Sequence, residues 1–144
     1  MSLFQKTIEK NKFIQKEKHK INDLLKKLLA QKLYKFPRPS ELDVPDEHGV
    51  YIIYNPDKKV DHVGRSISGR RGLNQRIKNH LHGLSSYTIK HLNGNASKLR
   101  EGYKFRYFLI SDDRERALVE ALAIGKLCPE HLGLGSKNSL GKSK

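Results

Sequence analysis

The stretch that decides the fold is Gly49-Val50-Tyr51-Ile52-Ile53-Tyr54, followed after Asn55-Pro56-Asp57-Lys58 by Val60-Asp61-His62-Val63-Gly64. Residues 50–54 are apolar, β-branched or aromatic, a composition that favours a strand. The segment from Asn55 to Lys58 carries side chains that favour a turn, and residues 60–63 resume the strand pattern. The sequence therefore predicts a β-hairpin whose loop is residues 55–58.

Antiparallel pairing across this loop predicts which side chains share a face. If residues 55–58 form the loop, Tyr54 lies opposite Lys59, and counting back places Tyr51 opposite His62. Directly opposed residues have Cβ atoms about 4.5–5.5 Å apart. We therefore expect a phenol beside an imidazole, an arrangement that a half-buried aromatic pair explains equally well. A slip of one residue would break this pairing.

The N-terminal part of the chain is a basic arm. Residues 1–40 contain 11 Lys or Arg against three acidic residues. Apolar side chains recur there at helical spacing, which predicts one or two amphipathic helices: Ile21, Leu25, Leu28, Leu29 and Leu33. The prolines at positions 37 and 39 end them. The arm either lies along DNA phosphates, packs its apolar face on the core, or does both.

After the hairpin, the sequence predicts an α/β unit of helices and one more strand. A helix is expected over 73–84, a short helix over 86–92 and a third strand over 104–110. Asp112 is placed as an N-cap with Glu115 at the capping-box position. The helix that follows should end near Pro129, with these side chains inward: Ala117, Leu118, Ala121, Ile124 and Cys128.

Composition limits the class of protein. A chain of 144 residues can form one hydrophobic core. Its 29 Lys and Arg against 15 Asp and Glu give a net charge of +14, which favours nucleic acid, an anionic membrane or an acidic protein as partner. No apolar run approaches the roughly 20 residues that span a bilayer, and no signal peptide opens the chain, so we expect a cytoplasmic protein. Cys128 is the single cysteine, which excludes an internal disulfide.

Three residues outside the hairpin are candidates for chemistry. Arg76 and His80 are four positions apart and share a helix face, at the edge of the apolar stripe. Glu120 is the one acidic residue between Arg116 and Pro129, and a solitary carboxylate at a core edge can bind a cation. The structural alternatives are an arginine and a histidine at the helix surface, and a glutamate paired with Arg116.

The sequence contains, in this order, Gly-Val-Tyr, His-Val-Gly-Arg-Ser, Leu-x-x-Arg-x-x-x-His and a late helix with one Glu. Together these elements resemble the GIY-YIG endonuclease domain. The resemblance covers roughly residues 48–130. It implies an α/β (α+β) fold with a small three-stranded antiparallel sheet flanked by helices, here preceded by the helical arm. It also implies metal-dependent hydrolysis of DNA phosphodiesters.

The resemblance assigns catalytic roles to Glu120 and to four further residues. Tyr51 matches the first-motif tyrosine, which contacts or deprotonates the attacking water. His62 stands where the second-motif tyrosine usually stands, and imidazole is also a proton acceptor. Arg76 matches the arginine that supports the phosphate charge, and His80 matches the auxiliary base one turn later. Tyr51 has a reference pKa near 10, so we expect nearby cations to lower it.

The remaining assignments concern metal and substrate. Glu120 matches the metal-binding glutamate and would hold one Mg²⁺ or Mn²⁺ ion per active site. Arg65, at the basic position after the second motif, and its neighbour Ser66 are expected to bind substrate. The family's late asparagine has only Asn138 as a counterpart.

These features predict three segments and one activity. The segments are a basic helical arm at 1–40, a nuclease-like domain at 41–134 and a flexible basic tail at 135–144. The activity is DNA endonuclease, of restriction type because the chain is short, with DNA as partner, no membrane and a homodimer for palindromic cutting. The alternatives are a repair or recombination nuclease of the same family, a non-catalytic nucleic-acid-binding module, and an RNA-binding ribosome-associated protein.

Overall fold

Strand β2, Gly49–Tyr54, is an interior strand of a four-stranded antiparallel sheet ordered β1-β4-β2-β3. The structure, a computed structural model, describes residues 1–133 of the chain. The other strands are β1 (Tyr34–Lys35), β3 (Val60–Arg65) and β4 (Lys104–Leu109). The expected antiparallel sheet is confirmed, with one strand more than the three expected, because the two-residue β1 pairs with β4.

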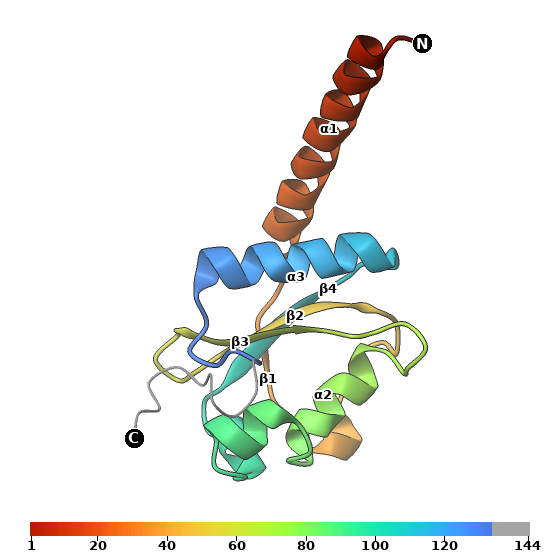
Figure 1. Ribbon diagram of the computed structural model, residues 1–144. Coiled ribbons are helices and arrows are strands. Elements are labelled where there is room, and N and C mark those ends of the chain that lie inside the picture. Colours follow the sequence, from red (N-terminus) through yellow and green to blue (C-terminus); the bar gives the residue numbers. More distant parts are fainter. Residues whose placement is uncertain (134–144) are drawn as a thin grey trace.

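Helices cover both faces of the sheet (Figure 1). On one face lie α1 (Leu3–Leu29) and α3 (Asp113–Leu127), and on the other lies α2 (Leu73–Leu81). The α2 face also carries three short helical segments, η1 (Pro39–Glu41), the π-helical turn η2 (Tyr87–His91) and η3 (Ala96–Arg100). The short helix expected over 86–92 is thus a single π-helical turn.

The apolar run of β2 follows from burial on both faces. Val50 and Ile52 belong to the core shared with α1 and α3. Tyr51 and Ile53 belong to the core on the α2 side. A strand covered on both sides has no polar face to alternate with, and β2 therefore lacks the alternation of a half-exposed strand.

The hairpin register differs from the expected one by two residues. Asn55 and Lys59 close the loop through the Asn55 N–H and the Lys59 carbonyl, so Tyr54 pairs with Val60 rather than with Lys59. A bulge then leaves Asp61 without an opposite residue. The expected pairing of Tyr51 with His62 is therefore wrong, because each of these two features shifts the register by one residue.

Two shifts of one residue preserve the face, because side chains alternate with period two. Tyr51 lies opposite Gly64, and His62 lies opposite Ile53. Tyr51 and His62 are consequently diagonal neighbours on the face that α2 covers. The phenol of Tyr51 occupies the space over Gly64, where an added Cβ would overlap its ring and hydroxyl.

The N-terminal arm is one continuous helix rather than two. Ile21, Leu25 and Leu28 are its buried residues, whereas Leu29 and Leu33 are exposed. The first turns of α1 extend away from the body of the molecule (Figure 1). Among residues 1–133, no helix has both the length and the apolar composition needed to cross a bilayer.

The inward face of α3 is only partly the expected one, since Leu118 and Ile124 do pack against the core. Asp112 caps the helix as predicted, accepting the N–H of Glu115, but Arg116, Val119 and Ala123 are the buried residues. Ala121 and Cys128, both expected inward, are exposed. Apolar residues occur all round this helix, so their spacing does not decide which side packs. Asn138 and the tail predicted over 135–144 lie outside the described residues.

Candidate active site

Tyr51, His62 and His80 meet in the core between the sheet and α2. The Tyr51 hydroxyl lies 2.6 Å from Nε2 of His80 and 3.4 Å from Nε2 of His62. Tyr51 and His80 are 0% exposed. The expected juxtaposition of phenol and imidazole is present, and His80 is the closer partner.

His80 reaches this position because of its place on α2. Leu73, Ile77 and His80 are spaced by four and three residues, so they share one face of the helix. Leu73 and Ile77 are buried against the sheet, and His80 is carried inward with them. It is a core residue, neither the surface residue nor the edge residue that its sequence position suggested.

Burial dominates the protonation of this cluster. Desolvation raises the pKa of Tyr51 to about 12, against the opposing positive charge of Arg76. Arg76 acts on this pKa in the expected direction, but the cost of burying a phenolate is larger, so the net shift in the free chain is upward. Desolvation also lowers the pKa of His80 to about 3 and that of His62 well below its usual value. Both imidazoles are therefore neutral at pH 7, and each has one nitrogen that can accept a proton.

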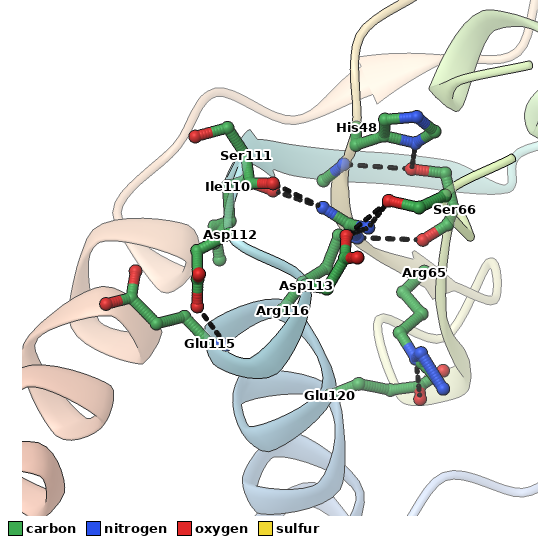
Figure 2. Close-up of polar contacts among 12 residues, drawn as sticks. His48, Arg65, Ser66, Ile110, Ser111, Asp112, Asp113, Glu115, Arg116 and Glu120 are labelled. Atoms are coloured by element: carbon green, nitrogen blue, oxygen red, sulfur yellow. Dashed lines mark hydrogen bonds and ion pairs between the residues drawn. The ribbon is translucent and has the colours of Figure 1, made fainter.

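Arg65 and Glu120 form an ion pair on the α3 side of the sheet (Figure 2). Nε of Arg65 lies 3.0 Å from Oε1 of Glu120, and the two side chains are 31% and 24% exposed. Burial raises the pKa of Glu120, while the charges of Arg65 and Arg76 lower it. Glu120 thus pairs with Arg65 from β3 and not with Arg116.

Arg116 fastens α3 to the ends of β3 and β4 (Figure 2). Its side chain is 2% exposed and donates to the carbonyls of Ser66 at 2.8 Å, Ile110 at 2.8 Å and Ser111 at 3.1 Å. It also bonds Asp113 at 2.6 Å. These bonds hold Arg65 on β3 beside Glu120 on α3.

Ser66 is buried and its hydroxyl is occupied. The oxygen accepts the Gly49 N–H at 3.0 Å and lies 3.0 Å from Nδ1 of His48 (Figure 2). The substrate-binding role expected of Ser66 stays a prediction, and in the free chain its side chain is directed into the structure. Ser66 thereby joins the end of β3 to the start of β2.

Arg76 connects the two groups of residues. Its positive charge lowers the pKa of Tyr51 on one face of the sheet and that of Glu120 on the other. Since β3 is an edge strand, a long side chain from α2 can influence both faces around it. Within residues 1–133, the buried Nε of Arg76 has no hydrogen-bond partner. A buried donor of this kind is costly unless a ligand uses it.

The available side chains fit a magnesium site in which the protein supplies few of the ligands. No group of three or more metal-ligating side chains occurs in residues 1–133. Mg²⁺ commonly keeps several waters and is held by one or two carboxylates together with substrate phosphate. Glu120 is partly exposed and can supply that single carboxylate once Arg65 turns away from it.

Several neighbours of the cluster were missed in the sequence. The ring of Tyr87 stacks on His62 with centroids 4.8 Å apart, and its hydroxyl donates to Asp61 at 2.6 Å. His131 lies 5.3 Å from His62 between ring centroids. The bulge at Asp61 directs adjacent side chains to one side, which no regular alternation predicts.

Comparison with solved structures finds chains similar to this one. One is the GIY-YIG N-terminal endonuclease domain of UvrC from Thermotoga maritima, in a point-mutant form bound to its catalytic divalent cation. It is 21% identical, with a TM-score of 0.43, over 76% of this chain and 91% of that chain. The same domain with magnesium bound is 22% identical, with a TM-score of 0.42, over 76% and 92%. No protein-family model and no curated protein matches the sequence.

Proposed function

We propose that this chain is a metal-dependent DNA endonuclease of the GIY-YIG type. The observation that carries the proposal is the position of Arg76. Among residues 1–133 its buried Nε has no hydrogen-bond partner, and its charge acts on the pKa values of both Tyr51 and Glu120. A phosphodiester would supply the missing acceptor and meet an acid–base pair on one side and a carboxylate on the other.

The arginines would bind the scissile phosphate. A guanidinium presents a fork of donors that matches two phosphate oxygens. The buried Nε of Arg76 has no acceptor among the described residues, whereas Arg65 is held by Glu120 at 3.0 Å. If the Glu120 carboxylate were used to hold a cation, Arg65 would be free to bind a phosphate oxygen. The ion pair of the free chain thus keeps both groups at the site without a metal.

Tyr51 and His80 would move the proton of the attacking water. The Tyr51 hydroxyl is within hydrogen-bond distance of Nε2 of His80, so Tyr51 can pass its own proton to His80 while accepting one from water. His62, the second-motif residue, flanks the same hydroxyl at 3.4 Å. In this proposal the phenol keeps the role of the family's first-motif tyrosine, with imidazoles in place of a second phenol.

Glu120 would hold one divalent cation, Mg²⁺ or Mn²⁺. When bound, such an ion neutralises charge on the phosphate and lowers the pKa of a coordinated water. The chain contributes the carboxylate, its partial burial and the arginines around it.

The test is nicking of supercoiled plasmid with and without Mg²⁺. Arg76→Ala and Glu120→Gln should each reduce nicking at least about 100-fold, as expected for loss of an electrostatic or metal-binding group. Glu115→Gln, on the same helix and paired at the surface with Lys20, removes an equal charge and should cut normally. Wild-type rates for Glu120→Gln, or cutting in EDTA, would refute the proposal. Binding without any cutting would favour the non-catalytic module.

A restriction role is the finer proposal, and repair or recombination is the alternative. Restriction predicts fixed-sequence, double-strand cuts in a linear duplex and a homodimer by analytical ultracentrifugation. Repair or recombination predicts cutting of damaged or branched DNA instead. A DNA substrate and the free thiol of Cys128 fit a cytoplasmic protein.

A further inference from the structure

The second nitrogen of His80 also has a buried partner. Nδ1 lies 2.6 Å from Oγ of Ser85, and Oγ of Ser85 lies 3.0 Å from Oγ1 of Thr88. Ser85 and Thr88 are buried along with His80. A chain of polar groups therefore runs from Tyr51 through His80 and Ser85 to Thr88, all within the core.

The local fold brings Ser85 back to His80. The helix α2 ends at Leu81, and Gly83 has a positive φ of 74°, a conformation that glycine adopts without strain. The Gly83 N–H bonds the His80 carbonyl at 3.0 Å, which turns the chain sharply. Ser85 then begins the turn that leads into η2, directly beside the imidazole.

The contacts of Thr88 determine which group donates in each hydrogen bond of this series. The Thr88 hydroxyl donates to the Ser85 carbonyl at 3.0 Å, and the Thr88 N–H donates to Oγ of Ser85 at 3.2 Å. Oγ1 of Thr88 has given its one proton and can accept that of the Ser85 hydroxyl. Oγ of Ser85 is then left to accept from Nδ1 of His80.

We propose that Ser85 and Thr88 are positioning residues that hold His80 as its Nδ1–H tautomer, so that Nε2 accepts the hydroxyl proton of Tyr51. The opposite tautomer would direct an N–H at the Tyr51 oxygen. The Tyr51 proton would then have only Nε2 of His62, at 3.4 Å, as an acceptor among the described residues. In the Nδ1–H tautomer, the Tyr51 hydroxyl donates to Nε2 of His80 across the short distance of 2.6 Å.

The tautomer is a property of the free protein, and only its catalytic consequence rests on the proposed nuclease function. A neutral Nε2 without a proton can act as the base for Tyr51, whereas a protonated Nε2 cannot. Ser85 and Thr88 would thus determine whether the acid–base pair works, without touching the substrate.

The direct experiment is two-bond ¹H–¹⁵N correlation of the histidine rings at pH 7.5. Wild type should show His80 with a pyrrole-type Nδ1 and a pyridine-type Nε2. Thr88→Val removes the acceptor for the Ser85 hydroxyl, which should then donate to Nδ1 and shift His80 toward the Nε2–H tautomer. Thr88→Ser keeps the hydroxyl and should retain the wild-type pattern. An Nε2–H tautomer in wild type, or no change in Thr88→Val, would overturn the inference.

Plasmid nicking provides the functional arm. In Thr88→Val, kcat should fall at least about tenfold with KM within about twofold, because the base is altered and DNA binding is not. Thr88→Ser should restore the rate. Unchanged kcat in a Thr88→Val protein whose tautomer has shifted would overturn the positioning role. If wild type does not cut DNA, the proposed function fails while the spectra still decide the tautomer.

Discussion

At the scale of single residues, Gly64 determines where Tyr51 can lie. A Cβ at position 64 would overlap the ring and hydroxyl of Tyr51, a buried group with no room to withdraw. Gly64→Ala should therefore lower the free energy of unfolding by about 1–3 kcal/mol, as overpacking does. Urea denaturation at constant m-value measures the change.

Gly125→Ala is the matched control for this substitution. Gly125 lies in α3, and an added Cβ would meet no atom within 4 Å. Alanine is the better helix former by about 0.5–1 kcal/mol, so this variant should be stabilised. A Gly64→Ala protein as stable as wild type would mean that Tyr51 does not occupy the space over residue 64.

The buried histidines make the stability of the chain depend on pH. Burial, followed by the charges of Arg76 and His131, lowers the pKa of His80 to about 3. In the unfolded chain His80 binds a proton near pH 6.5. The contribution of neutral His80 to stability is therefore complete above that pH. It is lost as pH falls from about 6.5 toward 3, at up to about 1.4 kcal/mol per pH unit. His62 adds a loss of the same sign.

Urea titrations at pH 7, 6 and 5 test this dependence. His80→Gln removes one buried titrating group, so its stability should fall less steeply than that of wild type between pH 6 and 5. His82→Gln, which replaces an exposed histidine at the end of the same helix, is the matched control for removing an imidazole from this region. Equal slopes in wild type and His80→Gln would contradict the burial of a neutral His80.

From the sequence one could predict which residues of the hairpin share a face, but not which residues lie opposite each other. Residue types and spacing predicted that Tyr51 and His62 share a face and that His80 follows Arg76 by one turn. They did not predict the five-residue loop or the bulge at Asp61, because both depend on how β3 closes over its neighbours. Ser85 was not predicted either, since its role depends on the sharp turn at Gly83.

At the scale of elements, Arg116 connects α3 with two strands. Arg116→Met would leave the carbonyls of Ser66, Ile110 and Ser111 without this donor. Buried acceptors without partners are costly, so the free energy of unfolding should fall by about 3 kcal/mol or more. Chemical denaturation monitored by circular dichroism gives the value.

Arg114→Met serves as the comparison for Arg116→Met. Arg114 is exposed on the same helix and pairs with Glu17 at the surface, where ion pairs contribute little. Its loss should leave the unfolding midpoint nearly unchanged. If the two variants were equally stable, the buried network of Arg116 would not be holding α3 in place.

Whole elements were predicted better than their packing. Strands β2, β3 and β4 and helices α2 and α3 follow from period and turn chemistry. The two-residue β1 has no periodicity to detect, and α3 is apolar on several sides. Its inward face was therefore decided by the partner surface and by Arg116, a charged residue that no hydrophobic pattern would place in a core.

At the scale of the whole molecule, the net charge of +14 should dominate DNA affinity. If six or more phosphates are contacted, affinity for a short duplex in EDTA should fall at least about 10³-fold between 50 and 200 mM salt. Fluorescence anisotropy over that range gives the slope of log K against log salt. Arg76→Ala should change the slope by no more than about one, because it would remove one proposed phosphate contact. Salt-independent affinity would exclude phosphate contacts as the main source of binding.

The long first helix gives the molecule an uneven shape. Of the 27 residues of α1, buried side chains begin at Ile21, and Glu17 pairs with Arg114 of α3. The turns before Glu17 extend outward as a rod of about 21 Å (Figure 1). Such a body tumbles anisotropically, and the amide bonds of α1 lie along the rod. Nuclear spins in α1 and in the sheet therefore relax with different effective correlation times, although both belong to one folded chain.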